Sequence, residues 1–254
     1  MRALGLLVTL LLAIGLGAGP AFAAGPGKAL DVDRDARAET KDGIKELIVG
    51  SDVFIGDRVV TDARGLVQIK FSDNTKLVVG PNSALLIEDY LLRADGSGGK
   101  FAINALSGTF RFVTGGASKD RYLIETPTGT IGVRGTSFDF NSDSRHMSLL
   151  LYHGAVVLCN YAGQCVTVDD ICEIGMADLS EAQILGITTE MANAERNQMR
   201  GMFRYADNQA PLLGQFRIAQ ARECFNRPVV TNDQESLVRS DDKPDFDDKY
   251  NYRN

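Results

Sequence analysis

Short runs of apolar and β-branched residues dominate the chain from Gly43 to about Ile171. The runs are separated by Gly, Pro, Asn and Asp, which favour turns over regular structure. Beyond Cys172 the apolar positions instead recur near the 3.6-residue period of a helix. The pattern therefore predicts a β module followed by a helical segment.

Residues 67–79 show the clearest hairpin pattern. The apolar residues of its two arms share one face only if Ile69 lies opposite Leu77. This pairing leaves a three-residue loop, 72–74, in which Asn74 is the candidate for the left-handed backbone conformation.

Two longer runs contain an internal glycine, Gly108 within 101–113 and Gly154 within 148–158. A glycine inside a strand pattern marks a bulge or a sharp bend, so these runs predict a sheet that folds over on itself. We expect a mainly β fold, either a compact antiparallel β-sandwich or a short flattened β-solenoid, with an appended C-terminal α-helical segment. The pattern does not decide between sandwich and solenoid.

The segment after Cys172 has helix signals. Asp178 and Glu181 have the spacing of a capping box, and Pro211 suits the first turn of a further helix. The stripe that follows the box favours a core face over an adaptable partner surface. Its members are Met191, Ala194, Met199, Met202, Phe203 and Ala206, and a later face holds Ile218, Ala221 and Phe225.

The two ends of the chain differ from the middle. A basic start, an apolar run and the site Ala21-Phe22-Ala23 have the pattern of a signal peptide, and no later stretch is long and apolar enough to span a bilayer. We therefore expect a periplasmic or secreted protein. The expected organisation is a signal peptide at 1–23, a linker at 24–42, a β domain at 43–172, a helical segment at 173–228 and a disordered acidic tail at 229–254.

Four cysteines occur late in the chain, at Cys159, Cys165, Cys172 and Cys224. An even number in an exported chain indicates two disulfides. Cys159 and Cys165 flank a turn-like loop, which favours that local bridge and leaves Cys172 for Cys224. Other pairings stay open, whereas the wide spacing disfavours a metal site.

The net charge and the absence of catalytic motifs argue against several classes of function. The net charge is −6 without a basic cluster, which argues against nucleic acid and anionic membranes as partners. No G-x-S-x-G or H-E-x-x-H motif is present, so we expect no enzyme and no catalytic, metal or cofactor-binding residues. Paired carboxylates for a glycan hydrolase would have to come from Asp73, Glu88, Asp89 and Glu125.

Arg134 is the one charged residue between Thr126 and Phe138. An arginine fork can lock strands together through carbonyls or through a carboxylate such as Glu125 or Asp139, and we favour this structural role. The alternative is a contact for an anionic partner.

Residues 56–61 read Gly-Asp-Arg-Val-Val-Thr, residues 73–75 read Asp-Asn-Thr, and Thr126-Pro127 is followed by Val-Arg-Gly-Thr at 133–136. These segments resemble the opening "G-D-x-V-x-T", the Asp-Gly-Thr-like turn, with asparagine in place of glycine, and the closing "T-P…V-R-G-T" of the FecR domain, the periplasmic module of FecR-type sensor and regulator proteins. The resemblance covers roughly Gly43 to Val168. The residues that carry the resemblance, in structural or binding roles, are Asp57, Asp73, Asn74, Thr126, Pro127, Arg134, Gly135 and Thr136.

The resemblance implies a periplasmic module that receives a signal from an outer-membrane transporter and passes it to a cytoplasmic sigma factor. We expect a stand-alone exported version without direct sigma-factor control, because no cytoplasmic N-terminal domain or later membrane span is evident. Our first hypothesis is a non-enzymatic binding or sensing module that docks an envelope protein through an exposed strand edge. The alternatives are a cell-wall glycan binder or weak glycan hydrolase, and a structural envelope protein.

Overall fold

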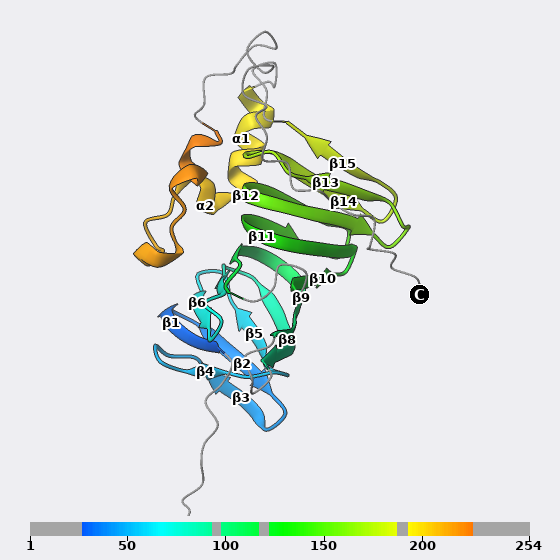
Figure 1. Cartoon of the computed structure of the whole chain (residues 1–254). Coiled ribbons are helices and arrows are strands. Elements are labelled where there is room, and N and C mark those ends of the chain that lie inside the picture. Colours follow the sequence, from blue (N-terminus) through cyan, green and yellow to red (C-terminus); the bar gives the residue numbers. More distant parts are fainter. Residues whose placement is uncertain (1–26, 93–97, 117–121, 187–192, 226–254) are drawn as a thin grey trace, which may run out of the picture.

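The computed structural model describes residues 27–92, 98–116, 122–186 and 193–225. Strands dominate these residues, and a short helical segment follows them (Figure 1). The mainly β fold with a C-terminal helical segment is therefore confirmed. The predicted signal peptide and acidic tail lie outside the described residues.

One hydrogen-bonded network joins all strands of the described residues. Neighbours pair antiparallel except β9 and β10, which run parallel. The strands are β1 Gly27–Asp33, β2 Ala36–Thr40, β3 Gly43–Glu46, β4 Asp52–Val53, β5 Arg58–Thr61, β6 Leu66–Phe71, β7 Lys76–Val79, β8 Ala84–Leu92, β9 Gly98–Val113, β10 Tyr122–Thr126, β11 Gly129–Ser142, β12 His146–Asn160, β13 Cys165–Val168, β14 Ile174–Asp178 and β15 Ala182–Leu185.

Three long strands, β9, β11 and β12, change partners halfway along their length. The first half of β9 pairs with β8 and β10, and its second half pairs with β7 and β11. The sheet thus forms two layers that share these strands. Layer A runs β3, β2, β5, β8, β9, β10, β11, β12, β13, and layer B runs β4, β1, β6, β7, β9, β11, β12, β14, β15.

Apolar side chains from both layers form one core cluster. Ile87 and Phe101 enter it from layer A, and Leu77 and Phe112 enter it from layer B. The arrangement combines features of both predicted architectures, since two layers pack face to face and strands pass from one layer to the other.

The bends occur at glycines, as the sequence predicts. Gly108 and Gly154 have φ of 120° and 83°, which disfavours any side chain. A Cβ at Gly108 would lie 2.1 Å from Ser83 Oγ, and one at Gly154 would lie 2.3 Å from the carbonyl oxygen of Gly135. These positions therefore need glycine both for backbone conformation and for space.

The β6–β7 hairpin has the predicted register, with Ile69 opposite Leu77. Asn74 is in the predicted left-handed conformation, with φ of 71°. Its backbone N–H donates to the Phe71 carbonyl at 3.0 Å and closes the loop. The alternation of apolar residues was sufficient to specify this pairing.

The linker prediction for 24–42 is wrong over residues 27–40, which form β1 and β2. Ala29, Ala36 and Ala38 are buried at alternating positions, and β1 pairs with β6 along six positions. Alanine has low strand propensity, and charged residues surround these alanines, so the local pattern is that of a polar segment. Tertiary pairing decides the structure here.

The helical prediction for 173–228 is wrong at its start, because β14 and β15 occupy 174–185. The Asp178 carboxylate accepts hydrogen bonds from the backbone N–H groups of Ser180 and Glu181, at 2.7 and 2.8 Å. A helix N-cap makes the same kind of bond. Here the bonds instead close a hairpin.

Helical structure begins at Asn193 and forms the C-terminal segment, which we define as residues 193–225. It contains α1 Asn193–Met202, α2 Arg204–Asp207 and two 3₁₀ turns, Gly214–Phe216 and Ala219–Glu223. Among the described helices, none has the length and apolar composition needed to cross a bilayer.

The C-terminal segment covers the outer face of layer B. Met199, Phe203 and Ala206 pack with Leu150 and Tyr152 of β12. The structure therefore places these members of the predicted stripe in a core, whereas Met191 lies outside the described residues. Ile218, Ala221 and Phe225 also join this cluster, as their shared face predicts.

Both disulfides form in the pairing that the sequence favours. Cys159–Cys165 closes the β12–β13 hairpin. Cys172–Cys224 ties the end of the C-terminal segment to the loop before β14. The second bridge spans 52 residues and so restricts the unfolded chain strongly.

A buried ion pair lies under the C-terminal segment. Arg111 of β9 and Asp139 of β11 are opposite one another in register, and each side chain is 1% exposed. Arg111 donates from Nε and Nη2 to the two carboxylate oxygens, at 2.6 and 2.9 Å. Tyr152 donates its hydroxyl to the same carboxylate at 2.7 Å. Bidentate pairing of this kind is a strong form of charged hydrogen bonding.

The other donors of Arg111 bind the C-terminal segment. Nη2 donates to the Tyr205 carbonyl at 2.9 Å, and Nη1 donates to the Phe216 carbonyl at 3.3 Å and to the Gln209 side-chain oxygen. Gln209 also bonds the backbone of Ile218, accepting from its N–H at 2.7 Å and donating to its carbonyl at 2.9 Å. The segment thus completes the hydrogen bonding of a buried guanidinium, which burial otherwise makes costly.

This surrounding shifts two pKa values. Burial disfavours the charged form of Arg111, but the charge and hydrogen bonds of Asp139 outweigh burial and raise the pKa of the guanidinium. Burial, followed by the negative charge of Asp139, raises the pKa of Tyr152 well above its ordinary value of 10.0. Tyr152 therefore stays protonated as a donor to Asp139.

We expect the Tyr152→Phe variant to change how stability depends on alkaline pH. Above about pH 10 the unfolded tyrosine loses its proton while folded Tyr152 keeps it, so the folded state binds more protons and its stability falls as pH rises. This single group contributes a slope of about 1.4 kcal/mol per pH unit. Urea unfolding between about pH 8 and 11 should show that slope reduced in the variant. Parallel curves for both proteins would contradict the assignment.

Candidate functional site

Two edge strands lie at one end of the sheet, β3 of layer A and β4 of layer B (Figure 1). β3 pairs with β2 alone, and all four of its residues are exposed. Its outer side therefore presents backbone N–H and C=O groups that no described strand pairs, which is the usual template for adding a strand. We call the surface formed by 43–49 and 54–55 the β3 edge.

The β3 edge carries exposed apolar side chains. Ile44, Ile48 and Val49 are 73%, 64% and 62% exposed, and Phe54 and Ile55 are also exposed. Three of them, Ile44, Phe54 and Ile55, line one groove of about 670 Å³ between the β2–β3 turn and the 54–57 turn. Exposed apolar side chains that gather in one groove are typical of an interaction site.

Local hydrogen bonds hold both walls of this groove. Thr40 Oγ1 accepts from the Asp42 N–H at 3.1 Å and donates to the Gly43 carbonyl at 3.0 Å. On the other wall, the buried Asp57 accepts from the Phe54 N–H at 2.8 Å. The apolar side chains are thus presented by fixed turns.

Charged residues surround the apolar groove. Lys41, Asp42 and Lys45 line it, and Glu46 ends β3. Lys45 Nζ reaches the Asp52 carbonyl at 3.5 Å, which links β3 to β4. Charges on an edge strand limit unselective pairing, so an added strand would need a matching pattern.

The closing and opening motif residues meet at the 114–116 loop, away from the β3 edge. Asp73 accepts from the Thr75 N–H and hydroxyl, at 2.9 and 2.7 Å, and from the Tyr122 hydroxyl at 2.7 Å. The Asp73 carbonyl accepts from the Gly116 N–H, and the Thr136 carbonyl accepts from the Thr114 N–H. These residues therefore join β6–β7, β10 and β11 at one corner.

The Thr126-Pro127 turn is also architectural. The buried Thr126 hydroxyl donates to the Gly129 carbonyl at 3.0 Å and accepts from the N–H groups of Thr128 and Gly129. Tyr161 donates its hydroxyl to the Thr126 carbonyl at 3.0 Å. Pro127 is exposed at the tip of this β10–β11 hairpin.

Sequence reasoning favours Arg134 as a clamp between strands, with Glu125 or Asp139 as an example of its carboxylate partner. Its side chain is exposed, and it precedes Gly135, whose φ is 66°, in the bulge of β11. The Asp139 carboxylate is bound by Arg111 and Tyr152 instead. The arginine that binds the buried Asp139 carboxylate is therefore Arg111.

The comparison with family models agrees with this placement of the motifs. Residues 57–157 match the family described as FecR protein. The chain carries a FecR domain. The match begins at the Asp57 turn and ends within β12, so the C-terminal segment lies outside it.

Solved structures resemble part of the chain. Two crystal structures described as "a putative anti-sigma factor from Parabacteroides distasonis ATCC 8503" each align with a TM-score of 0.40 and 13% identity. The alignment covers 50% of this chain and 57% of that chain, so this chain spans little more than half the length of that structure. Among curated proteins, no sequence matches this chain.

The four acids considered for glycan hydrolysis lie at different places in the sheet. Burial, followed by the charges of Glu125 and Glu88, raises the pKa of Tyr161, so these two acids lie near the same hydroxyl. Asp73 uses its carboxylate to hold Thr75 and Tyr122. Glu88 is exposed on β8, where it accepts from Asn104 at 3.2 Å. Asp89 and Glu125 lie on β8 and β10, respectively.

Among the described residues, one group of acids has the spacing to hold a cation. The carboxylate oxygens of Asp169, Asp170 and Glu173 lie within 4.8 Å of one another. Glu173 accepts from the N–H groups of Asp169 and Asp170, at 3.3 and 3.4 Å. Burial is the main cause that raises the pKa of Glu173. This carboxylate serves as a cap for the turn before β14.

Sequence reasoning did not identify the β3 edge. Residues 46–49 have the composition of a strand, whereas β3 ends at Glu46 and only Leu47 of these four residues is buried. The sequence feature that could have indicated this edge is the apolar residues next to two turn glycines, Gly50 and Gly56. Apolar residues that flank a turn at the end of a sheet have no second layer to cover them. Both glycines have positive φ, at 90° and 88°.

We expect Asp57→Ala to loosen the wall of the groove without unfolding the FecR domain. The substitution removes the acceptor for the Phe54 N–H, a loss of about 1 kcal/mol that should speed exchange of this amide by roughly 5- to 10-fold. Amide exchange measured by NMR checks this. Asp62→Ala, on the exposed β5–β6 turn, is the matched control. Equal Phe54 exchange in both variants would contradict the role of Asp57.

Proposed function

We propose that this chain is a non-enzymatic binding or sensing module of the cell envelope that docks a protein partner on the β3 edge. The observation that carries the proposal is the combination of an unpaired strand side with exposed Ile44, Phe54 and Ile55 in one groove. A partner strand would gain main-chain hydrogen bonds from β3 and apolar contact from the groove.

The energetics of this site suit a reversible contact. Complete burial of an isoleucine or phenylalanine side chain contributes about 1.5–3 kcal/mol, and these side chains are already partly covered. Added hydrogen bonds contribute about 1 kcal/mol each after exchange with water. The charges of Lys41, Asp42 and Lys45 around the groove would select among strands of similar hydrophobicity.

An envelope location is part of the proposal. The pattern of residues 1–23 supports export, and two disulfides are typical of an oxidising compartment. The FecR domain supports a regulatory role over an enzymatic one. The motif residues also support a non-enzymatic role, since the side chains of Asp57, Asp73 and Thr126 form hydrogen bonds within turns and between strands.

Site-specific photo-crosslinking tests the docking surface. A benzophenone amino acid placed at Ile44 or Ile55 should give a discrete protein adduct in cells that produce the chain, because both side chains are exposed in the groove. The same amino acid at Ile184, exposed on the edge strand β15 at the other end of the sheet, is the matched control and should give none.

A second variant tests whether the adduct depends on strand pairing. Glu46→Pro with benzophenone at Ile55 removes an N–H from the outer side of β3, because the N–H of the next residue, Leu47, points to β2 and donates to the Ala36 carbonyl. This variant should reduce the adduct by about tenfold relative to Glu46→Ala. No adduct from Ile44 or Ile55 would contradict the proposal. Equal adducts from Ile55 and Ile184, or an adduct made only of a second copy of this chain, would contradict it as well.

A further inference from the structure

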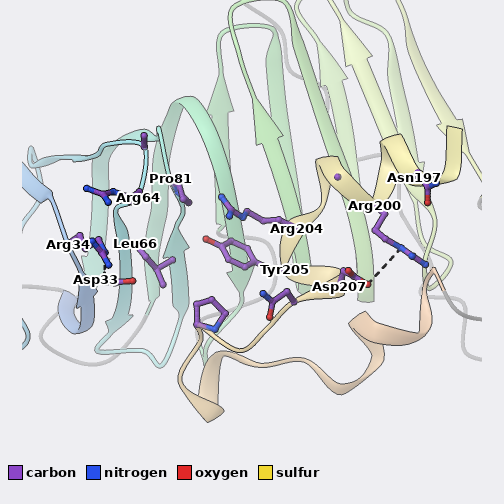
Figure 2. A pocket seen from close by; sticks show the side chains of 14 residues that line it. Asp33, Arg34, Arg64, Leu66, Pro81, Asn197, Arg200, Arg204, Tyr205 and Asp207 are labelled. Atoms are coloured by element: carbon purple, nitrogen blue, oxygen red, sulfur yellow. Dashed lines mark ion pairs between the residues drawn. The ribbon is translucent and has the colours of Figure 1, made fainter. Parts of the chain in front are cut away.

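A second groove lies between the sheet and the C-terminal segment (Figure 2). Its volume is about 680 Å³, and the β1–β2 and β5–β6 turns form one side while α1 and α2 form the other. The charged residues of its lining are four arginines, Arg34, Arg64, Arg200 and Arg204, and two aspartates, Asp33 and Asp207. The groove is therefore positive in a chain whose net charge is −6.

The aspartates leave most of this charge available. Asp33 lies 3.7 Å from Arg34, and Asp207 lies 3.8 Å from Arg200. Exposed pairs at such separations are weak. Arg200 also donates to the Phe225 carbonyl at 3.3 Å, so the available charge comes from the other three arginines. The Arg64 and Arg204 guanidinium groups form no ion pair or hydrogen bond with any residue in the described part of the chain.

A buried hydroxyl adds an independent observation. Tyr205 is 3% exposed, and its hydroxyl has no hydrogen-bond partner within the described residues. Figure 2 shows the ring extending from α2 toward Leu66, and the Arg204 guanidinium lies 5.9 Å from the ring centre. Burial raises the pKa of Tyr205, so the hydroxyl stays a donor. Buried donors without an acceptor are rare in folded proteins and call for a partner.

The close packing around this hydroxyl keeps it at the groove. A Cβ at Gly80 would lie 2.7 Å from Tyr205 Oη, so glycine leaves the space that the phenol occupies. The Tyr205 carbonyl is held by Arg111 at 2.9 Å. The same contact that attaches the C-terminal segment to the sheet thus positions the wall of this groove.

We propose that this groove binds a small anion with two or more phosphate or carboxylate groups, held by Arg34, Arg64 and Arg204 with Tyr205 as a further donor. The guanidinium fork matches both anions, and arginine is the only cationic residue type in the lining. The volume is that of a small-molecule site. This inference does not depend on the β3 edge, because the two grooves share no lining residue.

Calorimetric titration of the purified protein with pyrophosphate and with succinate, at low ionic strength, tests the site. One saturable site for at least one anion is expected, and the preferred anion separates phosphate from carboxylate recognition. The double variant Arg64→Gln/Arg204→Gln should weaken binding by at least about tenfold. Arg145→Gln, an exposed arginine outside the groove, should change affinity by less than about twofold.

The Tyr205→Phe variant distinguishes an effect on anion binding from an effect on folding. The hydroxyl has no partner in the protein, so its removal should leave the thermal midpoint unchanged or higher while affinity falls by about 3- to 10-fold. Three results would overturn the proposal: no saturable binding of either anion, equal weakening by Arg145→Gln and the double variant, or unchanged affinity in both groove variants.

Discussion

The buried pair of Arg111 and Asp139 is the constraint on which the rest of this molecule depends. A charge in a protein interior is tolerated only when its partner and its remaining donors are all provided. Asp139 provides the partner from the neighbouring strand, and the backbone of Tyr205 and Phe216 provides acceptors from the C-terminal segment. Layer B and the segment are therefore one structural unit, although about a hundred residues separate the groups that meet.

Because the C-terminal segment is attached to layer B, part of the sandwich is covered and another part stays exposed. Along β6 to β14 the outer face of layer B is covered, and a second polar contact, from Gln68 to the backbone of Pro211 and Leu213, extends the cover to β6. The β3 edge lies beyond this cover and keeps its apolar side chains exposed. The C-terminal segment thus leaves the β3 edge uncovered, while the boundary of the covered face forms the arginine-lined groove.

The parts of the fold that follow from neighbouring residues were predictable. The alternation around Asn74 specified a hairpin register, and Gly108 and Gly154 marked the bends because no other residue fits there. The parts that depend on distant contacts were not. Ala29 and Ala38 become strand residues only through pairing with remote strands, and the carboxylate of Asp178 can close a helix end or a hairpin with the same bonds.

The candidate sites could not be predicted from the sequence either, because they also depend on contacts between distant residues. In the run Phe110-Arg111-Phe112 the alternation indicates that Arg111 faces away from the main core, which normally means solvent, and no local signal shows that a segment covers it. Apolar residues such as Ile44 are expected to be buried, so the sequence does not distinguish a docking edge from a core strand.

Amide hydrogen exchange of the C-terminal segment in Arg111→Met tests the central claim most directly. Removing one partner of a buried pair costs about 3–5 kcal/mol, and the Cys172–Cys224 bridge keeps the loosened segment attached. The account predicts that exchange across 203–218 accelerates by more than about tenfold, while Arg134→Met at the exposed bulge leaves it unchanged. Equal exchange of this segment in the Arg111 variant and the unmodified protein would contradict the account.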